Sequence, residues 1–140
     1  NELDIPFVIA GKNPSDRLKE LAHRKPHTCI VENPSDAEMN DLIQKAQLHI
    51  LPSFTNSGIK LKLLNAVFNG RHVLVNDDMI KGTGLDKACQ LVNNPTEYKY
   101  HAFRLFHKKF TNEDIELRQG LLNTHFNNEQ HAKQLMQILH

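Results

Sequence analysis

Short apolar segments alternate along this sequence with segments whose apolar residues recur at the spacing of a helix. The strands predicted from this alternation cover residues 5–10, 28–31, 48–51, 72–75 and 91–92. The first is a near-continuous apolar run ended by Gly11, which is typical of a strand buried on both faces of a parallel sheet. Strands that are regularly followed by helices imply βαβ units with right-handed crossovers. The predicted fold class is therefore α/β, a Rossmann-like three-layer sandwich around a parallel sheet.

Capping residues indicate where the helices between these strands begin. Ser15 can cap the first helix, and Ser35 with Glu38 three positions later forms a capping box for the second. A third helix is expected over residues 58–69, with Gly70 well placed as its C-terminal glycine. The apolar residues expected on the buried faces of these three helices are Leu18, Leu21, Ala22, Met39, Leu42, Ile43, Ala46, Ile59, Leu63, Ala66 and Val67.

The region between the last two strands is expected to hold turns and one short helix. Asp77 and Asp78 follow the fourth strand, where a polar turn is expected. The glycines of residues 81–84 fit either a mobile loop facing a cleft or plain turn chemistry, and a short helix follows at 85–89.

A helical C-terminal tail is expected after the last strand. Asn94 followed by Pro95 is typical of a helix start, Thr111 can cap a second helix, and Asn127 can open a third. The first of these helices carries a stripe that is most simply core, made of Tyr98, Ala102, Phe106 and Phe110. The apolar positions expected to pack in the other two are Ile115, Leu117, Leu121, Leu122, Ala132, Leu135, Met136 and Leu139.

Composition limits the classes of protein that this chain can belong to. Its 140 residues fit a single domain over residues 1–140. Seventeen Lys and Arg against sixteen Asp and Glu give a net charge of +1, so no nucleic-acid partner is expected. No apolar run approaches the roughly 18 residues that a transmembrane segment needs. Cys29 and Cys89 have apolar neighbours and are expected to be buried free thiols, which favours a cytoplasmic location.

The segment after the third strand combines a glycine with two lysines. Residues 55–58 are expected to form a small polar turn in which Gly58 would let the backbone approach a ligand closely. The following helix presents free N–H groups and the positive end of its dipole, and Lys60 and Lys62 add cations that do not favour the helix itself. This combination predicts a site for an anion such as a phosphate. A solvated basic helix end is the alternative that these residues leave open.

Other ligand classes lack their sequence signals. The glycine-lysine spacing of a P-loop is absent, and no Gly-x-Gly-x-x-Gly follows the first strand, so no nicotinamide or flavin cofactor is expected. The nine histidines have no cysteine or carboxylate partners at ligand spacing, so no metal is expected. His49 and His72 lie in expected strands and are interpreted as packed or edge residues.

Residues 52–75 resemble a known family. The stretch Pro-Ser followed by Gly-Ile-Lys-Leu-Lys-Leu-Leu-Asn-Ala-Val-Phe-Asn-Gly-Arg-His-Val-Leu-Val is similar to the donor-binding stretch of group 1 glycosyltransferases of the GT-B fold. The strand over residues 7–11 and the helix over residues 36–46 also resemble that family. The resemblance implies the C-terminal domain of a two-domain enzyme of glycan biosynthesis. It implies transfer of a sugar, of hexosyl type, from a nucleotide diphosphate sugar to an acceptor hydroxyl.

The resemblance also implies which residues bind the donor. They are Gly11, Lys12, Glu32, Asn33, Ser53, Thr55, Asn56, Ser57, Gly58, Ile59, Lys60, Lys62 and Asn65. Gly11 and Lys12 would lie near the diphosphate, and Asn65 near the ribose. Ser57 and Asn65 occupy two positions where the family often has glutamates, which leaves the donor sugar open. No catalytic residue is assigned, and the nucleotide sugar is a substrate, so no cofactor or metal is expected.

The same resemblance sets expectations for the rest of the enzyme. The N-terminal acceptor domain and the first strand of this domain are expected to lie outside residues 1–140, so this fragment alone is expected to be inactive. Its partners would be the nucleotide-sugar donor and a glycan or lipid-linked acceptor held by the other domain. A peripheral location at the inner face of a membrane is open, as is the oligomeric state. The alternative function is a non-catalytic doubly wound module for protein interaction or phosphate sensing.

Overall fold

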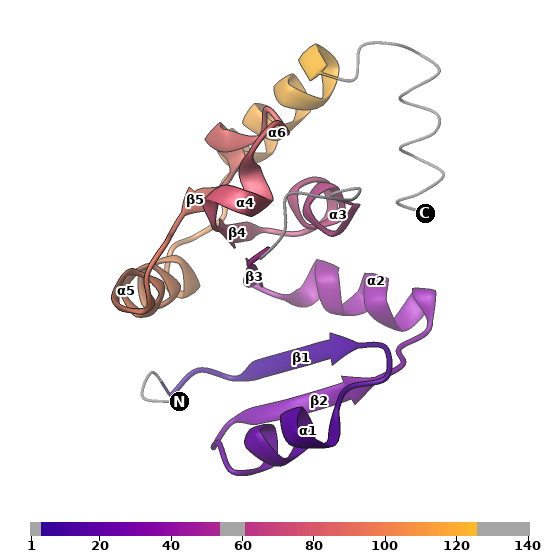
Figure 1. The fold of residues 1–140 in the computed structure, drawn as a ribbon. Helices are drawn as coiled ribbons and strands as arrows, with labels where there is room; N and C mark the ends of the chain where they lie inside the picture. Colours follow the sequence, from indigo (N-terminus) through magenta and orange to yellow (C-terminus); the bar gives the residue numbers. More distant parts are fainter. Residues whose placement is uncertain (1–3, 54–60, 126–140) are drawn as a thin grey trace. The chain divides into compact units, whose positions relative to one another are not determined.

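The computed structural model describes residues 4–53 and 61–125 (Figure 1). The chain divides into two compact units, Asn1–Leu42 and Ile43–His140. Every strand pair in the described residues is parallel, and helices connect the successive strands. The α/β fold class with parallel sheets is therefore confirmed.

The first unit is built on a two-stranded parallel sheet. Its elements are β1 (Phe7–Gly11), α1 (Asp16–His23), β2 (Thr28–Glu32) and most of α2 (Asp36–Lys45). The register pairs Phe7 with Thr28 at one end and Gly11 with Glu32 at the other. Both carboxyl ends therefore lie at one edge of the sheet.

Both helix starts predicted in this unit are confirmed. The Ser15 hydroxyl accepts a hydrogen bond from the backbone N–H of Leu18 at 3.1 Å. Ser35 and Glu38 form the reciprocal capping box, with the Glu38 N–H donating to the Ser35 hydroxyl at 3.1 Å and the Ser35 N–H donating to the Glu38 carboxylate at 3.2 Å. These caps depend only on residues three positions apart, which is why the sequence alone reveals them.

Burial in the first unit is lower than the apolar pattern predicts. Phe7 and Val8 are 39% and 44% exposed, so β1 is not buried on both faces. Leu21 of α1 and Cys29 of β2 are also exposed, whereas Ala22 of α1 is buried. A sheet of two strands has few neighbours on either face. The apolar pattern of a strand does not predict how many layers of structure cover it. The expectations of a doubly buried first strand and a buried Cys29 are therefore wrong.

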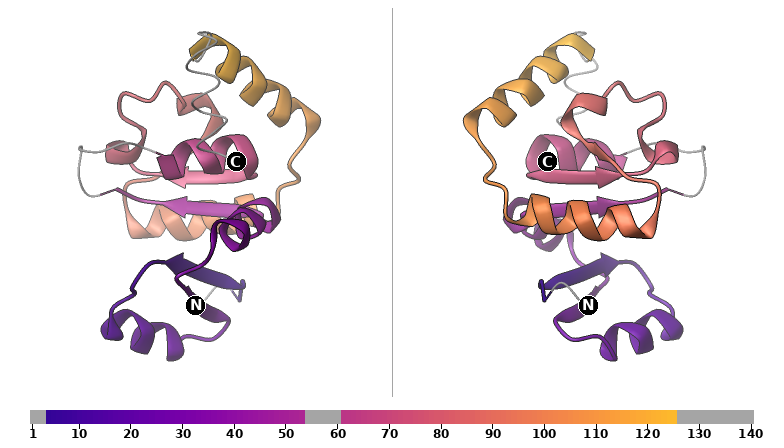
Figure 2. Two further views of the ribbon diagram at one scale, coloured as in Figure 1. Left: turned by 90° about the vertical axis from the view of Figure 1, so that its right-hand side faces the viewer. Right: turned by 90° about the vertical axis from the view of Figure 1, so that its left-hand side faces the viewer.

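The second unit contains a parallel sheet with strand order β3-β4-β5. Its elements are β3 (Leu48–Leu51), α3 (Leu61–Asn69), β4 (His72–Val75), α4 (Asp77–Ile80), the 3₁₀ helix η1 (Asp86–Ala88), β5 (Gln90–Leu91), α5 (Pro95–Phe106) and α6 (Asn112–His125). Figures 1 and 2 show α3 and α5 on opposite faces of β3 and β4, and both helices contact both strands. The three-layer arrangement is thus present within this unit. In the described residues, no strand ladder joins β1 to β3.

The central strand β4 carries the core of the second unit. All four of its residues are buried, because strands flank it on both sides and helices cover both faces. The buried cluster around it consists of Leu63, Ala66, Val67, Val73, Val75, Met79, Ile80, Leu85 and Ala88. His72 at its start is 6% exposed, and His49 of β3 is half-buried, so the interpretation of both as packed residues is confirmed.

The helix starts predicted at Asn94 and Thr111 are present in this unit, and the turn predicted at Asp77 differs. The Asn94 side chain accepts from the Glu97 N–H at 2.9 Å, and the Thr111 hydroxyl accepts from the Asp114 N–H at 3.3 Å. The expected polar turn at Asp77 is instead the first turn of α4. The expected short helix and last strand occur as η1 and β5, shifted by about one residue. The third tail helix, predicted from Asn127, lies outside the described residues.

Gly70 directly follows α3 as predicted, but its glycine is needed for packing and not for a left-handed cap. The described glycines with positive φ are Gly82 and Gly84, so Gly70 does not adopt the left-handed cap conformation. A Cβ atom at Gly70 would lie 2.5 Å from Nε2 of His49 and 2.7 Å from the carbonyl oxygen of Ala66. Close packing against β3 therefore requires this glycine.

The buried face of α6 differs from the prediction. Ile115 and Leu117 are 43% and 41% exposed, whereas Arg118 is only 7% exposed. The Arg118 guanidinium donates to the carbonyl oxygens of Arg71 at 2.8 Å and Ala88 at 3.1 Å, and it lies 4.4 Å from the centre of the Phe110 ring. Arg118 precedes Leu121 and Leu122 by three and four positions, so helical geometry places it on their face. Because Arg118 is charged, a search for apolar residues at helical spacing does not identify it as buried.

Candidate functional site

The four predicted site residues of the first unit lie at one edge of its sheet. Gly11 and Glu32 are paired in the parallel register of β1 and β2. Lys12 and Asn33 directly follow them, and both are exposed. Because ligands of doubly wound sheets bind at the carboxyl ends of strands, this edge fits the expected position of a binding site.

Asn33 holds the two strand ends together through its backbone and side chain. Its N–H donates to the carbonyl oxygen of Gly11 at 2.8 Å, and its side-chain oxygen accepts from the N–H of Asn13 at 2.8 Å. Both asparagines have positive φ, 49° for Asn33 and 47° for Asn13, a conformation that asparagine tolerates better than most residues. Asn33 therefore has a structural role in the turn as well as a candidate binding role.

The other polar groups of this edge are an ion pair and an exposed lysine. The Glu32 carboxylate lies 2.6 Å from Nζ of Lys19, with side chains that are 48% and 42% exposed. The hydrogen bond and charge of Glu32 raise the pKa of Lys19 above its ordinary value. Lys12, which directly follows Gly11, is exposed, and a Cβ atom at Gly11 would meet nothing within 4 Å. Packing does not require a glycine there, so the space above Gly11 is open.

In the second unit, Ser53 at the end of β3 is tied to the end of β4. The Ser53 N–H donates to the Asn76 side-chain oxygen at 3.0 Å, and the Asn76 amide donates to the Ser53 carbonyl oxygen at 2.7 Å. The same Asn76 oxygen caps α4 by accepting from the Met79 N–H at 3.1 Å. Asn76 is not among the predicted site residues. Its position directly before a helix start is the signal that could have revealed it.

Two of the predicted site residues, Lys62 and Asn65, lie in the described part of α3. Lys62 in the first described turn is exposed, and Asn65 is half-buried. The Asn65 side-chain oxygen accepts a hydrogen bond from the amide of Asn69 at 2.9 Å, as positions four apart on a helix allow. The remaining predicted residues lie outside the described part of the chain, namely Thr55, Asn56, Ser57, Gly58, Ile59 and Lys60.

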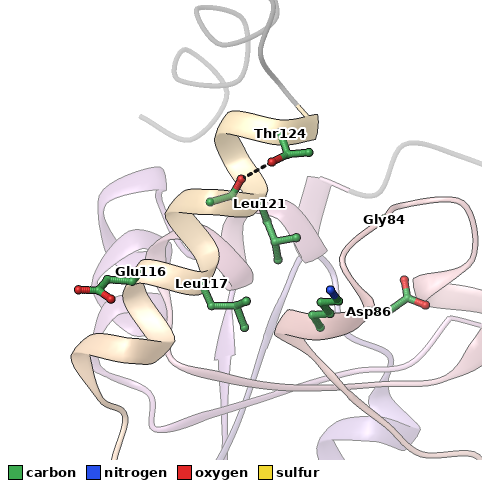
Figure 3. Close-up of a pocket in the computed structure, with 8 residues that line it drawn as sticks. Gly84, Asp86, Glu116, Leu117, Leu121 and Thr124 are labelled. Carbon is green, nitrogen blue, oxygen red and sulfur yellow. Dashed lines mark hydrogen bonds between the residues drawn. The ribbon is translucent and has the colours of Figure 1, made fainter.

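A separate hollow of about 520 Å³ lies in the second unit between α6 and the segment around η1. Figure 3 shows Leu117 and Leu121 projecting from α6 toward the segment that carries Asp86. Among the described residues that line it, none is a predicted donor residue. Gly82 and Gly84 have φ values of 76° and 71°, and the Thr83 hydroxyl donates to the Ile80 carbonyl oxygen at 2.7 Å, so turn chemistry accounts for this loop.

The described residues contain no metal centre, and the Cys89 thiol is not activated. No three histidine, cysteine, aspartate or glutamate side chains gather there to hold a metal ion. Burial raises the pKa of the Cys89 thiol to about 12, so this thiol stays protonated at neutral pH. The polar residues that follow the strands remain the candidate binding residues.

Polar residues follow the strands of both parallel sheets in this α/β chain, at the edge where doubly wound proteins commonly bind their ligands. A family profile described as "Glycosyl transferases group 1" matches residues 1–105. The chain belongs to this family of group 1 glycosyltransferases, whose reaction is glycosyl transfer. Comparison with curated proteins gives no match, and comparison with solved structures gives none. Among the described helices, none is long and apolar enough to cross a membrane.

Proposed function

We propose that this chain is the donor-binding part of a glycosyltransferase that uses a nucleotide diphosphate sugar. The observation that carries the proposal is that, within each unit, polar groups follow the carboxyl ends of the parallel strands in a chain of this family. In the first unit, Lys12 stands exposed beside Gly11, where a glycine that packing does not require leaves room for a diphosphate. In the second unit, the exposed Lys62 lies near the start of the helix that follows β3.

Each group has a role in this proposal that follows from its chemistry. The ammonium groups of Lys12 and Lys62 would neutralise the diphosphate. Lys60 and the backbone N–H groups of the predicted polar turn before it would do the same. The side chain of Asn65 would offer hydrogen bonds to ribose hydroxyls through its NH₂ group, while its oxygen accepts from Asn69. Glu32 and Asn33 would lie near the base. The transferred sugar would be a hexose, and the acceptor hydroxyl would belong to a glycan or a lipid-linked saccharide bound by a separate domain.

Calorimetric titration of the 140-residue chain with uridine and guanosine diphosphates tests the proposal. We expect one of the two to bind at millimolar concentration or below, without transfer activity from these residues alone. Lys12→Ala and Lys62→Ala should each weaken the affinity by about tenfold, since a charged hydrogen bond contributes about 1.5–3 kcal/mol. No added metal should be needed.

Two lysines at the opposite ends of strands provide matched controls. Lys25 is exposed and precedes the amino end of β2, and Lys45 ends α2 before the amino end of β3. Lys25→Ala and Lys45→Ala should leave the affinity unchanged within about twofold, because strand-end ligands bind at the opposite edge. Absence of binding by both diphosphates would overturn the donor-binding role and would favour the non-catalytic interaction module.

A further inference from the structure

Helix α5 has one face in the core and an opposite face rich in aromatic side chains. Ala102 and Leu105 are 8% and 5% exposed, and the helix contacts β3 and β4. Tyr100 and Phe103, by contrast, are 64% and 51% exposed. Burial of such large rings is normally favourable, so two of them exposed on one helix of a folded unit call for an explanation.

These two rings share one side of the helix with a neighbouring histidine. Tyr100, Phe103 and His107 follow one another at three and four positions, so they share one side of the helix and its end. The Phe103 and His107 rings lie with their centres 4.5 Å apart. Tyr100 also contacts the His101 ring edge-on, with centres 4.9 Å apart. We name the surface of Tyr100, Phe103 and His107 the α5 aromatic face.

Helix α5 and the four residues after it carry an excess of positive charge. Residues 95–110 contain four cationic side chains and the single carboxylate Glu97, a net charge of +3 with neutral histidines. The cations are Lys99, Arg104, Lys108 and Lys109. Because the whole chain carries +1, the other residues together carry −2. Positive charge is therefore concentrated on and just after this one helix.

We propose that the α5 aromatic face binds reversibly to an anionic phospholipid surface. A helix with aromatic residues on one side and lysine or arginine beside them lies in the interface of a bilayer, with rings at the headgroup level and cations against anionic lipids. The long stems of the lysines let their ammonium groups reach the headgroups while the rings insert. The opposite face of α5 remains packed on the sheet, so binding requires no unfolding.

The shape of the surface favours a membrane over single-stranded nucleic acid. Proteins that hold such strands use a basic groove lined by aromatic rings. The α5 aromatic face is the convex outer side of a helix, and the described hollow of the second unit lies instead at α6 and η1. The proposal is independent of the donor-binding role, because none of its residues belongs to the candidate donor site.

Cosedimentation of the 140-residue chain with vesicles tests this proposal. Vesicles of phosphatidylcholine alone and of an equimolar mixture of phosphatidylcholine and phosphatidylglycerol should be compared at about 0.1 M salt. We expect binding to the anionic vesicles to be at least about tenfold stronger, because several cations gain attraction near such a surface. Raising the salt to about 0.5 M should weaken that binding, since it shortens the screening length.

Two pairs of variants separate the contributions of rings and charges. Tyr100→Ser with Phe103→Ser should reduce anionic-vesicle binding by at least about tenfold. The matched change Ile115→Ser with Leu117→Ser removes two exposed apolar residues of α6, which are 43% and 41% exposed, and should leave binding unchanged. Lys108→Glu with Lys109→Glu should abolish binding. Arg17→Glu with Lys25→Glu, an equal change of charge in the first unit, should reduce it far less.

Circular dichroism of each variant checks that it folds, and all eight substitutions lie at exposed positions. Equal binding to neutral and anionic vesicles would overturn the proposal, as would equal losses in the target and control variants. A chain that bound a single-stranded oligonucleotide but neither kind of vesicle would also overturn it. Diphosphate titration of the α5 variants should match the unaltered chain, which separates failure of this proposal from failure of the donor-binding role.

Discussion

At the residue scale, Arg118 combines a buried position with a positive charge and no carboxylate partner among the ion pairs of the described residues. Its guanidinium bonds two carbonyl oxygens that come from different segments, one just before β4 and one at the end of η1. Burial lowers the pKa of Arg118 below its ordinary value, but arginine is charged at any accessible pH. Arg118 therefore connects α6 to two segments of the core through backbone contacts and its stacking on Phe110.

Arg118→Ala should destabilise the second unit by about 2–4 kcal/mol, because it leaves a cavity and removes a donor from two carbonyl oxygens. Urea unfolding followed by circular dichroism measures this change. Arg17→Ala on the exposed side of α1 is the control and should shift the free energy of unfolding by less than about 0.5 kcal/mol. A loss at Arg118 below about 1 kcal/mol would show that its contacts do not stabilise the core.

At the element scale, what the sequence predicts best is what depends on near neighbours. The Ser15, Ser35 and Asn94 caps are present as expected, since each needs only a side chain and an N–H three positions later. The strands also lie close to their predicted ranges. Burial follows from contacts distant in sequence, so the exposed Phe7 and the buried Arg118 could not be predicted from local pattern.

In the candidate site too, some features could be predicted from the sequence and others could not. The register of β1 and β2 brings Gly11 and Glu32 together, which alternation of strands and helices already implied. The bonds between Ser53 and Asn76 could not be predicted, because they depend on which two strands become neighbours in the sheet. The positions of Gly58 and Lys60 lie outside the described residues, so their part in the site stays a prediction.

Gly70 provides a test of packing between a helix end and a strand. Gly70→Ala should destabilise the chain by about 1–3 kcal/mol, because its Cβ atom would collide with the His49 ring and the Ala66 carbonyl group. Gly120→Ala in α6 is a matched control, since a Cβ atom there would meet nothing within 4 Å. That control should be neutral or stabilising by up to about 1 kcal/mol, as alanine favours a helix. Equal stability of both variants would contradict the steric role of Gly70, and thermal unfolding distinguishes the outcomes.

At the scale of the whole molecule, two packed histidines make stability depend on pH. Burial is the main cause that lowers the pKa of both His49 and His72 below the ordinary value of 6.5. In each, Nε2 lies within hydrogen-bond distance of a backbone carbonyl oxygen, 3.1 Å to Ile43 for His49 and 2.9 Å to Lys108 for His72. The unfolded chain therefore takes up protons at a higher pH than the folded chain does.

The stability contributed by these neutral rings is present above pH 6.5 and is lost as the pH falls through their lower folded pKa values. We expect the free energy of unfolding to decrease from pH 7.5 to pH 5. Replacing His72 with Gln should reduce that dependence, whereas His23→Gln at an exposed position should not. Urea unfolding at several pH values measures both. A stability that rises on acidification would contradict the assignment.

The unequal exposure of the two thiols makes the chain selective toward alkylating reagents. Cys29 is exposed on β2, whereas the half-buried Cys89 stays protonated at neutral pH and lacks the reactive thiolate form. A maleimide dye at neutral pH should therefore attach to Cys29 alone. Because Cys29 lies on β2 three residues before Glu32, the unaltered sequence already provides a fluorescent reporter about 10 Å along the strand from the edge where we expect the donor to bind.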